Sequence, residues 1–168
     1  MAYELVETIT VGSGGASSIE FTSIPQDGTD LVLKISARST GGGTRPNYQL
    51  TVNDDTTASQ KWLRLNGTGS GVASGENDTA SAIIVARVAG SDATANTFNS
   101  SSIYISNYTS SSEKSISADD VTEDNATEAY QTITAAQTAD SSPVTSIQLF
   151  LFSDSFAEHS TASLYKIY

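Results

Sequence analysis

The chain has no cysteine, one histidine and only eight lysines plus arginines among its 168 residues. The lack of cysteine excludes disulfide bridges and thiolate chemistry. Because 19 acidic residues bring the formal net charge to −11, we expect no nucleic acid and no anionic membrane as a partner. No apolar run approaches the roughly 20 residues that span a bilayer. The first ten residues lack the basic and apolar stretches of a signal peptide, so we expect synthesis in a cytoplasm.

Serine and threonine dominate what is present, with 27 and 21 residues. Residues that favour strands are broken by Gly, Asn and Asp, which is typical of many short strands joined by polar loops. No segment carries a convincing helical period of apolar residues. A length of 168 residues fits one domain. The sequence therefore predicts a single all-β domain over residues 1–168.

Period-two alternation is clearest in Asp30–Ser39, where Leu31, Leu33 and Ile35 alternate with more polar residues. The polar segment Gly67–Asp78 is predicted to be an exposed loop, and Asp119–Ala129 leaves room for one helical turn. Other strands are predicted at Tyr3–Val11, Ser18–Ile24, Tyr48–Val52, Lys61–Asn66, Ser81–Val88, Thr97–Tyr108, Lys114–Val121, Ala129–Ala136, Ser146–Phe152 and Ser160–Tyr168. About ten short strands at this spacing predict a β-sandwich of jelly-roll-like architecture.

Two groups of residues could in principle serve catalysis. His159 lies beside Ser160, but neighbouring residues on a strand point to opposite faces, which favours a surface histidine over a triad. The acidic cluster Asp119–Asp124 would suit a glycosidase only if two carboxyl groups faced each other across a cleft. A solvated polar segment explains this cluster better, so we expect no enzyme activity.

The acidic loops could instead bind calcium. Oxygen-rich groups occur at Asp27 with Asp30, at Asn53–Asp55, at Glu76–Asp78 and at Asp119–Asn125. Calcium takes six to eight oxygen ligands, often from distant loops, but none of these segments follows the EF-hand spacing. Plain turn-forming Asx residues are the preferred interpretation, with one structural calcium left open and no other cofactor expected.

Several segments together resemble small virion-associated structural proteins of marine tailed phages, such as those that infect cyanobacteria. The resemblance extends over almost the whole chain, and the segments that carry it contain no catalytic residues: Tyr3–Gly15, Ile19–Pro25, Asp30–Arg38, Ile103–Tyr108, Asn125–Thr127, Ala129–Gln131 and Ser160–Ile167. The resemblance implies a β-sandwich, jelly-roll-like module that decorates capsids or builds fibre knobs. It implies a location in the virion, after synthesis in the host cytoplasm.

We therefore expect a capsid decoration (cement) protein that binds the major capsid protein and copies of itself, as a homotrimer first and a dimer second. The alternative is a receptor- or glycan-binding tip of a tail fibre. Residues 1–11 are the candidate anchoring or exchanged strand, because a glycine-rich segment follows them. The candidate oligomer or capsid contacts are Tyr3, Leu5, Val6, Ile9 and Val11.

Overall fold

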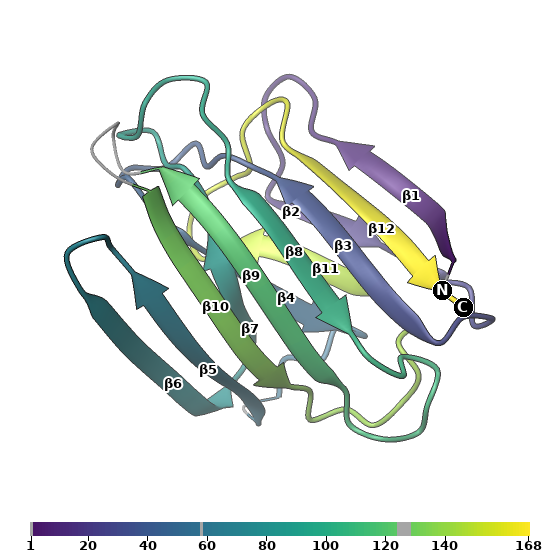
Figure 1. The fold of residues 1–168 in the computed structure, drawn as a ribbon. Coiled ribbons are helices and arrows are strands. Elements are labelled where there is room, and N and C mark those ends of the chain that lie inside the picture. Colours follow the sequence, from purple (N-terminus) through teal and green to yellow (C-terminus); the bar gives the residue numbers. More distant parts are fainter. Residues whose placement is uncertain (1, 58, 124–128) are drawn as a thin grey trace.

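The computed structural model describes residues 2–57, 59–123 and 129–168, and these form twelve strands in two antiparallel sheets. The two sheets lie face to face, with the larger one in front in Figure 1. The prediction of an all-β sandwich is confirmed. The described part of the chain contains no helix that is long and apolar enough to cross a bilayer.

The larger sheet, called the large sheet here, contains both ends of the chain. From edge to edge it consists of β1 (Tyr3–Thr10), β12 (Thr161–Ile167), β3 (Asp30–Ser36), β8 (Ser100–Ile105), β9 (Ser115–Glu123), β10 (Ala129–Gln137), β5 (Gln60–Gly67) and β6 (Val72–Ala80). The small sheet consists of β2 (Ser18–Phe21), β11 (Ile147–Leu151), β4 (Asn47–Val52) and β7 (Ile83–Arg87). The two termini lie side by side in Figure 1 because β1 pairs with β12.

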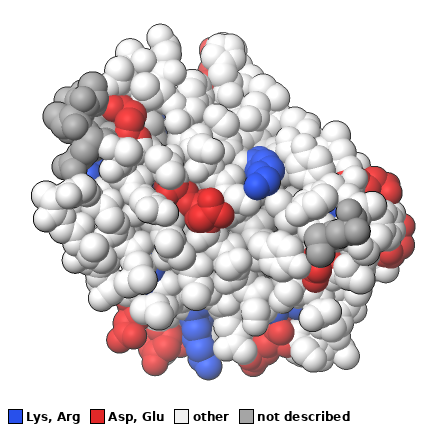
Figure 2. Space-filling model, in the orientation of Figure 1, with Lys and Arg blue, Asp and Glu red and all other residues white. Residues whose placement is uncertain are grey.

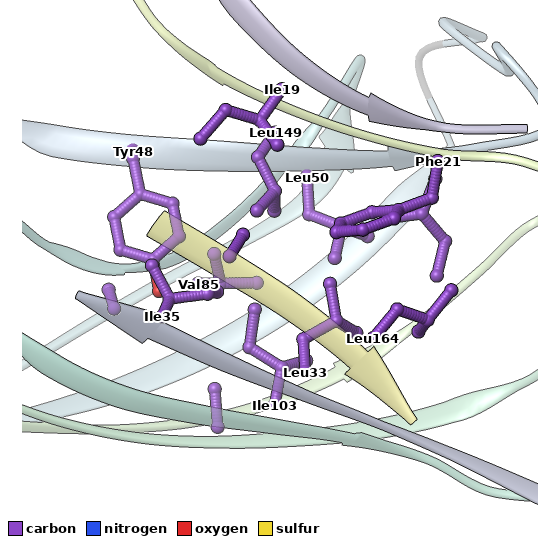
Figure 3. Close-up of a cluster of buried hydrophobic side chains, with 14 of the residues drawn as sticks. Ile19, Phe21, Leu33, Ile35, Tyr48, Leu50, Val85, Ile103, Leu149 and Leu164 are labelled. Carbon is purple, nitrogen blue, oxygen red and sulfur yellow. The ribbon is translucent and has the colours of Figure 1, made fainter. Parts of the chain in front are cut away.

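The apolar core fills the space between the small sheet and the strands β12, β3 and β8. Figure 3 shows Leu33, Ile103 and Leu164 of the large sheet pointing toward Phe21 and Leu149 of the small sheet. All five side chains are at most 1% exposed. Alternation therefore works here as expected, because each of these strands presents every second residue to the core.

Beyond Ile116 and Ala118 of β9 the inner face of the large sheet changes character, although β7 of the small sheet still packs against β9, β10 and β5. In β10 the inward residues include Tyr130, Thr132 and Thr134, which are buried but largely polar. The Thr134 hydroxyl donates to the carbonyl of Val85 in β7 at 2.9 Å. The Arg87 guanidinium lies 4.9 Å from the centre of the Tyr130 ring. Hydrogen bonds and cation–π contacts thus replace apolar packing beyond the core.

Two sequence-based predictions are wrong in the described residues. Most of the segment Gly67–Asp78 is not a loop, because Val72–Ala80 forms the edge strand β6 and only the chain around Thr68–Gly71 turns. β6 pairs on one side only and is mostly exposed, so it carries no alternation that could reveal it. Residues 119–123 are strand rather than a helical turn, and residues 124–128 lie outside the described residues.

Two phenylalanines offer a matched test of the core. Phe21 is 1% exposed between the sheets, whereas Phe152, just after β11, is 86% exposed. We expect Phe21→Ala to lower the free energy of unfolding by about 3–5 kcal/mol, since it leaves a cavity. Phe152→Ala should change it by less than about 0.5 kcal/mol. Urea denaturation measures both, and similar losses for the two variants would contradict the assignment of the core.

Candidate functional site

The five predicted contact residues of the first strand do not share one surface. β1 pairs with β12 of the same chain, and a bulge lies between Leu5 and Glu7. Tyr3 and Leu5 are 59% and 52% exposed on the strand. Val6 and Ile9 pack partly buried against the core, and Val11 is itself buried in it. Tyr3 and Leu5 therefore remain available to a partner, while Val6, Ile9 and Val11 contribute to the fold of their own chain.

An ionic cluster ties β1 to the end of the chain. The Lys166 ammonium lies 2.8 Å from the Asp27 carboxylate and 3.3 Å from that of Glu4 in β1. The Tyr168 hydroxyl donates to the same Glu4 carboxylate at 2.7 Å. The hydrogen bond with Asp27 is the main reason why the pKa of Lys166 is raised above its usual value. Release of β1 into another copy would therefore separate Glu4 from the Lys166 ammonium and the Tyr168 hydroxyl, while Asp27 would stay with Lys166.

The widest uncovered surface is the outer face of the large sheet, on the side away from the small sheet. Two cross-strand rows on this face follow directly from the strand registers. The first row runs Leu5, Tyr165, Val32, Tyr104, Ser117, Ala135 and Leu63. The second row runs Thr8, Ser163, Lys34, Ser102, Asp119, Ile133 and Leu65.

Apolar side chains gather at both flanks of this outer face. Leu63, Leu65 and Ile133 are 50–51% exposed on the neighbouring strands β5 and β10. Tyr3 and Leu5 are exposed to a similar extent at the β1 edge. Half-exposed apolar residues that adjoin one another mark a contact surface more often than isolated ones do. Tyr3 and Leu5 of the β1 flank were predicted from the sequence as contacts. The flank on β5 and β10 was not predicted, because the sequence does not show which strands lie next to each other.

The outer face carries little charge for so acidic a protein. Among the described strands from β12 to β10, its outward-facing charges are Asp30, Lys34, Asp119 and Glu123. Asp30 and Glu123 stand at strand ends, and their carboxylates accept hydrogen bonds from groups that include the Tyr104 hydroxyl and the Thr94 N–H, respectively. Figure 2 views the molecule from this side: a basic and some acidic side chains lie near the middle, and further acidic side chains gather along the lower and right margins. Most of the remaining surface in this view is uncharged.

The acidic cluster of the sequence is divided between the two faces of β9. Asp119 points outward, whereas Asp120 is 1% exposed on the inner face. The Asp120 carboxylate accepts from Asn99 Nδ2 at 2.7 Å and from the Arg87 N–H at 3.2 Å. Burial nevertheless raises the pKa of Asp120 to about 7. Two carboxylates on opposite faces of one strand cannot flank a glycosidic bond, which removes this pair as a glycosidase candidate.

The histidine and its neighbours have structural environments. His159 is exposed and has a φ of 72°. Its backbone N–H donates to the Val11 carbonyl at 3.0 Å. Ser160 is fully buried, and its hydroxyl accepts from the Arg38 N–H at 3.1 Å. A nucleophile must be reachable by substrate, so this buried serine is not placed to act as one.

The carboxylates proposed as calcium ligands are held by protein donors. Asp27 binds Lys166, and the Asp55 carboxylate accepts from the Thr57 N–H at 2.9 Å and from Gln60 Nε2 at 2.7 Å. Within the described ranges, no group of three or more acidic, histidine or cysteine side chains is arranged to hold a metal ion. Asn125, the last of the candidate ligands, lies outside the described residues.

A hollow of about 670 Å³ lies where β5, β6 and β10 adjoin. Its lining combines the charged residues Lys61, Glu76 and Asp78 with Gln137 and Leu63. Charged and amide side chains in a hollow are suited to a small polar ligand. No protein-family model, no curated protein and no solved structure matches the chain.

Asp120 should make stability depend on pH. Its native pKa of about 7 exceeds the ordinary value of 3.8, so the native state binds more protons than the unfolded state between these values. The contribution of Asp120 to stability therefore falls as pH rises from about 4 to 7, by up to roughly 4 kcal/mol. We expect wild type to lose stability relative to Asp120→Asn between pH 5 and pH 8, in urea denaturation. Parallel curves, or a carboxyl ¹³C titration midpoint near 4, would contradict this.

Lys166 should control the attachment of β1. We expect Lys166→Met to speed amide hydrogen exchange across residues 3–10 by at least ~10-fold, because Glu4 and Asp27 lose their shared cation. Lys61→Met removes an exposed lysine from the same sheet and should leave exchange in β1 unchanged. Unaltered protection of β1 in Lys166→Met would show that apolar packing alone holds the strand.

Proposed function

We propose that the chain is a virion structural protein of a tailed phage, a capsid decoration protein displayed on the head and made in the host cytoplasm. Its work is binding rather than catalysis. The observation that carries the proposal is the broad outer face of the large sheet, which carries few charges and has half-exposed apolar residues at both flanks. Burial of such a face against the major capsid protein or a neighbouring copy would add binding free energy to the shell.

The strand order supports a jelly-roll-type fold, which is common in capsid and lectin domains. In a jelly roll, strands one, eight, three and six form one sheet, and strands two, seven, four and five form the other. When the pairs β5–β6 and β9–β10 are set aside, the remaining strands follow this order as β1-β12-β3-β8 and β2-β11-β4-β7. Both added pairs extend the same sheet beyond β8, so they enlarge the outer face.

The composition also fits dense display. A net charge of −11 keeps separate copies from aggregating, while a neutral face still allows specific contact. Self-association belongs to the proposal. The expected oligomer is a trimer on a local symmetry axis or a dimer, and no cofactor is required.

A second candidate function is the receptor- or glycan-binding tip of a tail fibre. The hollow lined by Lys61, Glu76, Asp78 and Gln137 favours it, since carboxylate and amide side chains can form hydrogen bonds with sugar hydroxyl groups. A glycan array and a host-cell adsorption assay test this function directly. Binding that Gln137→Ala abolishes would support the fibre tip.

The decoration proposal is tested by mixing the purified protein with bare capsids and measuring co-sedimentation. We expect saturable binding at a fixed ratio to the capsid subunits. Leu65→Glu should weaken it at least ~10-fold, because a charge enters an apolar contact. Phe152→Glu, which alters an exposed apolar residue after β11, serves as the matched control. Absence of binding to heads, together with adsorption to host cells, would overturn the proposal in favour of the fibre tip.

A further inference from the structure

We propose that the outer face of the large sheet binds a second copy of this chain, related by a two-fold axis that lies in the interface and runs along β8. This inference rests on the proposed role of the outer face as a docking surface and names its occupant. It also selects a two-fold dimer over the trimer that the sequence favours.

Three strands on each side of β8 can be set against one another, and β6 lies beyond them at the far edge. On one side lie β3, β12 and β1, and on the other side lie β9, β10 and β5. An axis along β8 sets each strand of one copy against the strand at equal distance on the other side of β8 in its partner. Since cross-strand rows run perpendicular to the strands, each row then faces itself in reverse order. In such an isologous arrangement, a row favours the dimer if the residues on one side of β8 complement the residues on the other side.

The two central charges satisfy this test. Lys34 in β3 and Asp119 in β9 are both paired in register with Ser102 of β8, one on each side. The Lys34 ammonium donates to the Ser102 hydroxyl at 2.8 Å, so the side chain lies along this row. The axis places Lys34 of each copy opposite Asp119 of the other. The dimer therefore contains this charge contact twice, and no like charges meet at its centre.

The apolar flanks satisfy the same test. In the first row the axis sets Leu5 of β1 opposite Leu63 of β5, and Tyr165 of β12 opposite Ala135 of β10. Leu5 and Leu63 are 52% and 51% exposed, so each still has apolar surface to bury. About half of each leucine stays uncovered in the single chain, and the two-fold arrangement sets the two leucines against each other at both ends of the row.

The size of the face agrees with a stable dimer. Strands about 4.8 Å apart with about seven residues each at 3.3 Å give the strands from β1 to β5 an area of roughly 700–800 Å². A standard protein interface buries about 800 Å² on each partner. Aligned sheets pack about 10 Å apart, a gap that a lysine and an aspartate can bridge. The near-neutral centre also limits the repulsion between two chains of net charge −11.

Charge reversal tests the inference on the purified full chain, without capsids. Sedimentation velocity over a range of concentrations should show two 17.5-kDa chains in reversible association. Lys34→Glu and Asp119→Lys should each weaken the dimer at least ~10-fold, because like charges then face each other at two places. The double variant should recover the affinity to within about threefold. Glu158→Lys, in the exposed turn before β12, changes the net charge as Asp119→Lys does and should not weaken the dimer.

The outcomes separate this inference from the proposed function. A monomer at all concentrations, a trimer, or a double variant as weak as the single ones would overturn the two-fold dimer. If the chain binds capsids as a monomer through the outer face, the capsid protein occupies that face and only the dimer is wrong. If the dimer forms with the expected charge pattern but ignores capsids, the inference stands and the decoration role fails.

Discussion

The unequal width of the two sheets is the constraint on which the rest of the structure depends. The small sheet has four strands against eight, and the buried apolar core reaches no further across the large sheet than Ile116 and Ala118 of β9. The inner face of the added strands must then be satisfied by other means. Thr132, Thr134 and Asp120 are buried there among hydrogen-bonding partners rather than among leucines. The low apolar content of the chain, 38%, follows from this division.

The same widening creates the outer face. Strands that a small core could not hold alone are added at the free edge of β8, and their backbones pair while their outward side chains remain uncovered. Ser and Thr keep most of this surface neutral, and Leu63, Leu65 and Ile133 make one flank apolar. A neutral surface with apolar ends, on a protein of net charge −11, is the property from which binding was inferred.

The alternation of apolar and polar residues was enough to predict a strand from the sequence where one face of that strand is buried. β3 and β11 were predicted, as Asp30–Ser39 and Ser146–Phe152, because their apolar residues alternate. β6 was not predicted because only its backbone pairing with β5 makes it a strand. Its side chains are mostly exposed, so apolar and polar residues do not alternate along it. Tyr3 and Leu5 were predicted as contacts, and both are exposed in the structure. The apolar flank on β5 and β10 and the raised pKa of Asp120 were not predicted, because both depend on contacts between residues that are far apart in the sequence. The functional inferences stay predictions.

The most direct test of the central claim, that the outer face is buried in the assembled state, is hydroxyl-radical footprinting read by mass spectrometry. The free chain at a concentration below association is compared with the chain on the particle. Side-chain oxidation at Leu63, Leu65 and Ile133 should fall severalfold on assembly, while Phe152 stays as reactive as before. Equal oxidation of the three outer-face residues in both states, with protection elsewhere, would contradict the account.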